Sequence, residues 1–335
     1  MRSWVLVCAC LTAVLPAQER KAEYQAYSYD AGGNRLGSRS YAELQRLGQI
    51  MRKETVDTLN GRAAPLEQVE EKILEDGPGG RVIERTVQRY SLDGRPGTPE
   101  KIRIEERPGP SGGLTVTTTR YEGDLNGRLQ MYERATTRST SSGDTTDAVT
   151  EVERPTISGS LEVVERKVQR EVVRGSRSTS DLTVYRRNGG QFAPAARETT
   201  DVVRTDGTET STSVRYNTVN ASGAMTFAGQ TVINVERRPD GSEHRIISEY
   251  GGAEPGRSID SGGRTGAQLR EQIIVEREVR PDSTVVERTG VRRVSLSDPT
   301  KLEPYQPVSE VVCRGACLPP PPAEKRDEQK TDSGT

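Results

Sequence analysis

The chain has 335 residues, a formal net charge of −1, 29% charged and 31% hydrophobic residues. Balanced charge provides no field that attracts nucleic acid or an anionic membrane surface, so neither is an expected partner. Only 4% of the residues are aromatic, which excludes a thick aromatic core and favours a thin sheet.

The N-terminus has the layout of a secretory leader. Arg2 precedes an apolar run from Trp4 to Leu15, and Pro16-Ala17 follows it. The run is too short to span a bilayer, so residues 1–17 are predicted to be a signal peptide, with a lipid anchor at Cys10 as the minor alternative. No later segment reaches 18 apolar residues, so no transmembrane span is predicted in the mature chain. Export predicts a secreted, periplasmic or cell-surface bacterial protein in an oxidising compartment.

Residues 18–53 form an N-terminal segment with two possible structures. Ser40 to Glu43 matches a helix-capping box, and Leu44, Leu47 and Ile50 follow at helical spacing, which predicts a short helix over residues 40–53. The turn phrases on either side instead favour a strand, and both alternatives stay open.

Residues 54–312 repeat one short phrase, in which an extended run ends near a tyrosine and then turns on Asn-Gly, Asp-Gly or Ser-Gly. Its anchors lie 31, 34, 30, 31 and 34 residues apart, at Tyr90, Tyr121, Pro155, Tyr185, Tyr216 and Tyr250. A fixed period of this size indicates a repeat architecture, in which each unit buries its apolar face against its neighbours.

A second set of turns has the same period and alternates with the first, at Gly80, Gly113, Gly143, Gly175, Gly207 and Gly241. The runs between turns are rich in Val and Thr, which favour strands, and Asn-Gly and Asp-Gly are typical of hairpins. In one such run Leu114, Val116 and Thr118 share a face. Residues 251–268 form a Gly/Ser-rich insertion.

The predicted fold is therefore all-β. It is a repetitive antiparallel meander of long hairpins, about 31–34 residues each, that forms a thin sandwich, a barrel-like sheet or a partly single-layered sheet. Closure of the sheet depends on register and twist, which the imperfect alternation does not determine.

Charged dipeptides recur at matching places, at Glu84-Arg85, Glu106-Arg107, Glu133-Arg134, Glu165-Arg166, Glu236-Arg237, Glu276-Arg277 and Glu287-Arg288. Residues of opposite charge on neighbouring strands pair across a sheet, so these dipeptides are predicted to form structural ion pairs. The alternative is a regular lattice that binds a ligand.

The C-terminal segment, residues 313–335, begins with the motif CRGAC. Two cysteines four residues apart in an exported chain predict a disulfide between Cys313 and Cys317, with free thiols as the alternative. Four prolines follow Leu318, which predicts a polyproline spacer and a disordered tail.

No catalytic motif is present, and neither cofactor nor metal is expected. His244 follows Asp-Gly and is predicted on an exposed hairpin, and Tyr90, Tyr121, Tyr185 and Tyr216 are interpreted as architecture. The predicted function is a non-catalytic exported protein with a structural or binding role in the envelope or outside the cell. Alternatives are an acidic-glycan or envelope-polymer binding module and, second, an extracellular hydrolase. The partner is unknown; an envelope polysaccharide or another surface protein is the class considered.

Overall fold

The structure is a computed structural model that describes residues 20–46, 49–57, 63–91, 93–109, 113–124, 128–188, 190–218, 224–251, 267–295, 297–298 and 300–317. Strands and turns make up this part of the chain. The strands are β1 Arg20–Tyr29, β2 Arg35–Arg46, β3 Gln49–Asp57, β4 Ala63–Gly77, β5 Gly80–Arg89, β6 Glu100–Pro108, β7 Leu114–Gly123, β8 Leu129–Ser142, β9 Thr145–Pro155, β10 Leu161–Arg174, β11 Arg177–Asn188, β12 Gln191–Thr205, β13 Thr208–Thr218, β14 Met225–Arg237, β15 Glu243–Gly251, β16 Gln268–Val279, β17 Val285–Arg293 and β18 Gln306–Gly315.

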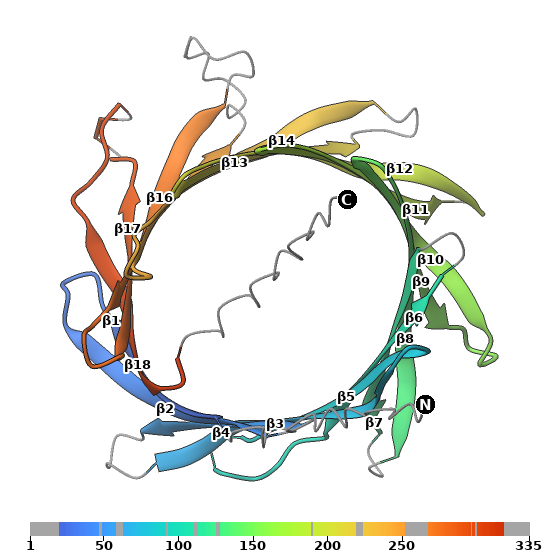
Figure 1. The fold of residues 1–335 in the computed structure, drawn as a ribbon, viewed down its shortest axis with the longest axis horizontal. Coiled ribbons are helices and arrows are strands. Elements are labelled where there is room, and N and C mark those ends of the chain that lie inside the picture. Colours follow the sequence, from blue (N-terminus) through green and yellow to red (C-terminus); the bar gives the residue numbers. More distant parts are fainter. Residues whose placement is uncertain are drawn as a thin grey trace, which may run out of the picture.

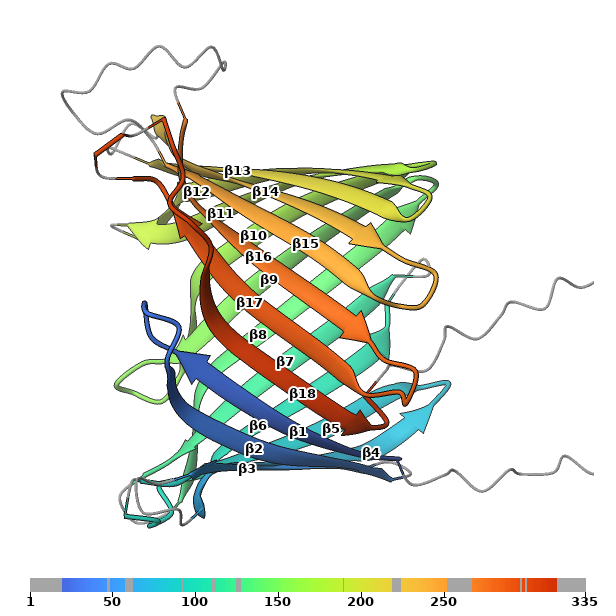
Figure 2. The ribbon, with the colours of Figure 1, turned by 90° about the vertical axis from the view of Figure 1, so that its left-hand side faces the viewer.

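All 18 strands belong to one antiparallel sheet in which each strand pairs with the next. The sheet closes because β18 also pairs with β1, from Ala22 opposite Gly315 to Ser28 opposite Ser309. Seen along its axis the molecule is a ring (Figure 1), and from the side its strands run obliquely around a barrel (Figure 2). The predicted all-β antiparallel meander is confirmed, in its barrel-like form.

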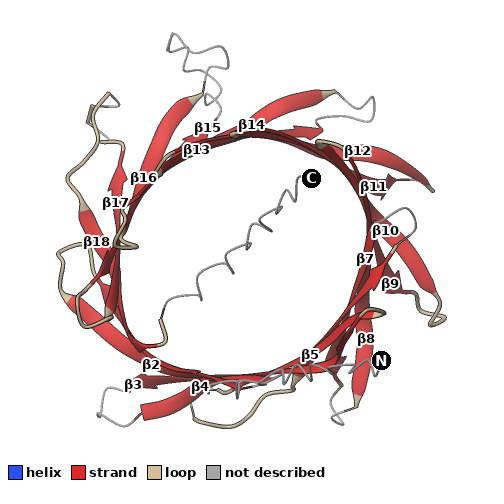
Figure 3. Ribbon diagram, viewed as in Figure 1, coloured by secondary structure: helices blue, strands red, loops and turns tan. Residues whose placement is uncertain are grey.

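Each sequence repeat is one hairpin, and the two predicted sets of turns lie at opposite ends of the barrel. Colouring by secondary structure shows the ring built from strands joined by such turns (Figure 3). The glycine set forms short turns, and Gly80, Gly143, Gly175, Gly207 and Gly241 have positive φ angles there. The strand β1 begins, and the strand β18 ends, at this same short-turn end of the barrel. The opposite end carries the longer connections, such as residues 90–99 and 294–305.

The tyrosines of the repeat mark β-bulges. The register shifts at Arg120/Tyr121, Val184/Tyr185, Arg215/Tyr216 and Glu249/Tyr250, always where the strand meets its successor near the long-loop end. A bulge adds local twist and is common at barrel rims, so a tyrosine at the same place in these four hairpins helps the sheet to curl.

The N-terminal segment belongs to the ring. The described residues between 40 and 53 lie in β2 and β3, so the strand alternative is correct and the helix alternative is wrong. The predicted signal peptide, residues 252–266 of the predicted insertion, and the predicted polyproline spacer and tail from residue 318 lie outside the described residues.

Aspartates stabilise several turns through backbone hydrogen bonds. The Ser242 N–H donates to Asp240 Oδ1 at 2.8 Å, and the Thr284 N–H donates to Asp282 Oδ1 at 3.0 Å. These backbone bonds lower the pKa of each carboxyl below its ordinary value of 3.8. A lowered pKa means that the ionised carboxylate stabilises the fold above that ordinary value, and that this stability is lost as the pH falls through the folded-state pKa.

We therefore expect the double variant Asp240→Asn/Asp282→Asn to melt below the wild type at pH 7. Asparagine keeps the acceptor oxygen but not the charge, so the difference in Tm should disappear as the wild-type carboxylates become protonated below pH 3.8. Thermal melts followed by circular dichroism from pH 7 to pH 2 measure this. A difference that stays constant over the range would show that the charge contributes nothing.

Candidate functional site: the barrel lumen

The two faces of the wall are distinguished by the end of β18. Cys313 forms a disulfide with Cys317, and the short coloured segment that follows β18, which ends at Cys317, turns into the ring (Figure 1). The side chain of Cys313 therefore points inward. Residues opposite one another in register share a face, so the pairing around the ring assigns each strand residue to a lumenal or an outer face.

Burial supports this assignment. Most of the buried hydrophobic residues lie on the lumenal face, where side chains of a curved wall crowd together: Ala22, Ile83, Val87, Val152, Val235, Val285, Val291 and Cys313. Val82 and Val286 lie on the outer face. The predicted alternation in β7 is confirmed, with Leu114, Val116 and Thr118 on the lumenal face.

The ring is wide enough to be hollow. With strands about 4.8 Å apart and tilted by about 40°, a ring of this many strands has a backbone diameter on the order of 35 Å. Lumenal side chains leave an opening on the order of 20 Å, because strands of the described chain all lie in the wall. Smaller barrels are filled by their own side chains, but barrels of this class retain an aqueous lumen.

Ion pairs line the lumen over β4 to β6. Arg85 donates to Glu71 at 2.6 Å, and Arg89 lies 3.1 Å from Glu67. Arg89 also lies 3.5 Å from Glu100. These charges and several Val and Ile side chains line a hollow of about 570 Å³, whose lining residues are Glu43, Ile50, Glu67, Val69, Glu71, Arg85, Val87, Arg89, Glu100, Ile102 and Arg120.

The band of charges continues around the wall through β7 to β11. Glu133 accepts a hydrogen bond from Arg154 at 3.0 Å and lies 4.0 Å from Arg120, so one carboxylate joins two guanidinium groups. Arg186 donates to Glu165 at 3.0 Å in a second hollow of about 310 Å³. The lumenal surface thus offers positively charged hydrogen-bond donors and negatively charged acceptors, with small apolar residues between them.

The outer face carries ion pairs as well. Arg134 donates to Glu153 at 2.6 Å, while Glu151 accepts from Arg166 at 2.8 Å and from Arg138 at 3.3 Å. Other outer pairs are Lys101–Glu84, Arg103–Glu105, Arg107–Glu75, Arg177–Asp201, Arg197–Asp181 and Arg288–Glu310. Because these ion pairs are spread over many strands, the outer face of the described strands lacks a continuous apolar band. On the lipid face of a membrane barrel, each Arg or Lys would cost about 2–4 kcal/mol at the bilayer midplane.

The repeated Glu-Arg dipeptides explain why both faces are charged. Successive strand residues point to opposite faces, so Glu133 lies in the lumen and Arg134 outside. The same division holds for Glu165-Arg166, with Glu165 lumenal. The predicted cross-strand pairing is confirmed for both members of these two dipeptides, and each pair is worth roughly 0.2–1 kcal/mol. Sequence reasoning missed that the Glu and the Arg of each dipeptide point to opposite faces of the sheet. The alternation of side chains along a strand was enough to predict this.

Aromatic residues form a row on the outer face near the long-loop end. The predicted structural tyrosines Tyr121, Tyr185 and Tyr216 lie there beside their bulges. Tyr216 packs edge-to-face on Phe227 with ring centroids 6.3 Å apart. Tyr90 instead follows the last residue of β5 and forms an isolated bridge to Pro96. The place of these tyrosines at the register shifts supports their interpretation as architecture.

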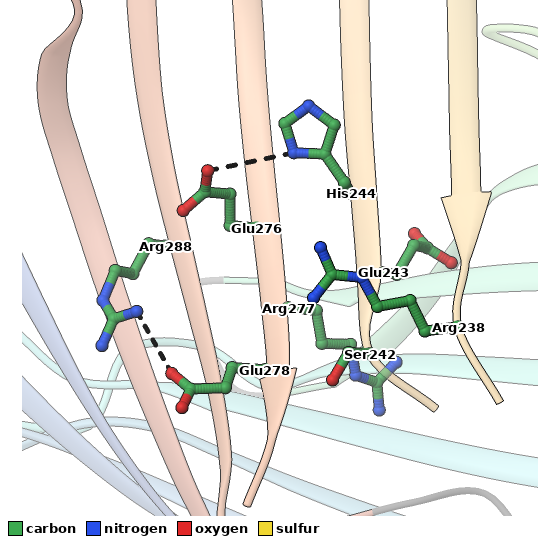
Figure 4. A pocket seen from close by; sticks show the side chains of 8 residues that line it. All are labelled: Arg238, Ser242, Glu243, His244, Glu276, Arg277, Glu278 and Arg288. Atoms are coloured by element: carbon green, nitrogen blue, oxygen red, sulfur yellow. Dashed lines mark hydrogen bonds and ion pairs between the residues drawn. The ribbon is translucent and has the colours of Figure 1, made fainter. Parts of the chain in front are cut away.

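His244 lies in β15, not on the predicted hairpin turn, which comprises residues 238–242. Its Nδ1 is 3.9 Å from Glu276 Oε1, and Arg288 pairs with Glu278 at 3.3 Å in the same small hollow of about 250 Å³ (Figure 4). Three arginines and three glutamates line this hollow, so their charges balance.

The predicted disulfide is confirmed, with Cα atoms of Cys313 and Cys317 5.8 Å apart. Gly315 has a φ of +92° within the clip, and the Ala316 N–H donates to the Lys21 carbonyl at 2.9 Å. Within the described ranges, no group of three or more His, Cys, Asp or Glu residues is placed to hold a metal. The same ranges contain no helix that is long and apolar enough to cross a membrane.

No protein-family model matches the sequence, and no curated protein matches it. Among solved structures, the chain is similar to OmpF of Salmonella typhi in a complex with daunomycin, with a TM-score of 0.45 and 8% identity, over 89% of this chain and 97% of that one. It is also similar to CdiB from Acinetobacter baumannii, with a TM-score of 0.37 and 9% identity, over 89% of this chain and 60% of that one. At these scores neither likeness carries an argument about function.

The function predicted from the sequence is wrong. It assumed a thin sheet with a non-catalytic structural or binding role, and left closure undecided. The sheet instead closes through the β1–β18 pairing into an 18-stranded ring around a polar lumen. A barrel of this many strands is wide enough to enclose an aqueous lumen.

Proposed function

We propose that the protein is a channel of the cell envelope, in which the barrel gives polar solutes an aqueous passage. The observation that carries the proposal is the closed ring of 18 strands around a charged lumen. Passage along such a wall needs no chemical step, because the lumenal carboxylates and guanidinium groups replace part of the hydration of a passing solute. Their balanced signs predict little selection between anions and cations.

A matched pair of cysteine variants tests this proposal. Thr137 lies on the lumenal face of β8, where it shares a hydrogen bond with Thr150 at 2.8 Å, and Thr136 beside it lies on the outer face. Both side chains are half-buried. A bulky maleimide attached to Thr137→Cys should obstruct the lumen, whereas the same reagent on Thr136→Cys should not.

The measurement is the uptake of polar dyes of graded size by cells that produce each variant, before and after labelling. We expect labelling to reduce uptake in Thr137→Cys cells, most strongly for the largest dye that still enters. Uptake in Thr136→Cys cells should not change. Equal uptake before and after labelling at position 137, with labelling verified by peptide mass, would contradict the channel.

A further inference from the structure

The outer wall of the barrel carries ion pairs that indicate whether it faces water or lipid. Its ion pairs are close: Arg134–Glu153 and Arg103–Glu105, both at 2.6 Å, lie within strands, and Lys101, near the start of β6, lies 2.8 Å from Glu84. Arg138, which pairs with Glu151, keeps 61% of its side chain exposed on this face. Solvated charges of this kind recur on neighbouring strands around much of the circumference.

The lumenal face of the wall is charged as well, and it carries Arg85–Glu71, Arg89–Glu67 and Arg186–Glu165. A strand that crosses lipid alternates apolar and polar residues, and one face then forms an apolar band between two aromatic girdles. Here each Glu-Arg dipeptide places one charge on each face, so neither face forms such a band in the described strands.

The aromatic row also differs from the two aromatic girdles of a membrane barrel. Tyr121, Tyr185 and Tyr216 lie near the long-loop end alone, and charges replace apolar residues between that row and the short turns. Arg197 is paired with Asp181 and lies directly opposite Tyr216 in register, so charge reaches the aromatic row itself.

We infer that the outer wall faces water along its length. This inference rests on the proposed channel and places its outer wall in a hydrated layer of the envelope, not in a layer of acyl chains. The ion-pair network then keeps the wall hydrated.

The test uses the full chain carrying a fluorescent thiol label at Thr136→Cys on the outer wall or at Thr137→Cys in the lumen. Each protein is purified without detergent and mixed with vesicles of phosphatidylethanolamine and phosphatidylglycerol. Quenching by aqueous iodide is compared with quenching by nitroxide-labelled lipid, and vesicle flotation is followed in parallel.

We expect a folded protein without detergent, no flotation, strong iodide quenching at both positions and none by the labelled lipid. Flotation with lipid quenching of the Thr136→Cys label and loss of its iodide quenching would overturn the inference. That outcome would leave the channel standing, since dye uptake tests the lumen separately. Conversely, a hydrated wall with no effect of lumenal labelling on uptake would retain the wall assignment and remove the channel.

Discussion

Substituting Ala22 by aspartate is expected to open the ring between β1 and β18. Ala22 is 4% exposed and packs against Val285 and Cys313 at the seam, where the two ends of the sheet meet. A carboxylate there has no partner, and an uncompensated buried charge costs roughly 3–5 kcal/mol. This loss is concentrated on the single pairing that joins strands distant in sequence.

An opened ring exposes two edge strands with unpaired backbone groups, and such edges pair with other chains. Light scattering after size-exclusion chromatography should therefore show oligomers for Ala22→Asp, and a thermal melt should show a lower Tm. Ser28→Asp is the matched control, because Ser28 lies on the same strand and the same face but is exposed. A monomeric Ala22→Asp protein with the Tm of the control would contradict the importance of the seam.

Replacing Gly80 by alanine is expected to be the most damaging single change in a turn. Gly80 begins β5 with a φ of +127°, a conformation that L side chains rarely adopt. An added Cβ would also overlap the carbonyl oxygen of Glu106 and lie 2.9 Å from Arg107 Cδ on β6. Backbone strain alone costs roughly 1–3 kcal/mol, and the overlap with a backbone atom adds to it.

The same turn supplies the control. Gly77 ends β4 without a left-handed φ, and an added Cβ there meets nothing within 4 Å. Gly77→Ala should therefore change the free energy of unfolding by no more than about 0.5 kcal/mol. Chemical denaturation followed by circular dichroism gives both values. Equal stabilities for the two variants would show that the close approach of β5 and β6 at Gly80 is not required.

The local structure followed from the sequence because its determinants are local. Asp-Gly and Asn-Gly dipeptides require positive φ angles, and Val- and Thr-rich runs favour strands, so turns and strands were predictable from neighbouring residues. Tyr121 and Tyr216 were recognised as architecture, but their bulges were not, since a bulge is defined by the partner strand. The short helix considered for residues 40–53 failed because pairing with β1 and β4 outweighs its local helical pattern.

The charged lumen was only half predictable. The sequence shows that Glu133 and Arg134 are neighbours and that such residues pair across strands. The structure shows that Glu133 joins Arg154 in the lumen and that Arg134 joins Glu153 outside. Which face is lumenal depends on the direction in which the whole sheet curls, and no single hairpin contains that information.

By itself the sequence determined the repeat, the strands, the turns and the disulfide between Cys313 and Cys317. Only the tertiary structure decided that the ends of the sheet meet, with Ala22 opposite Gly315, and that a lumen lies inside. The physical reason is that closure depends on the combined twist, tilt and register of every strand pair around the ring. Small differences in these quantities separate an open sheet from a barrel, and they leave no local pattern in the residues.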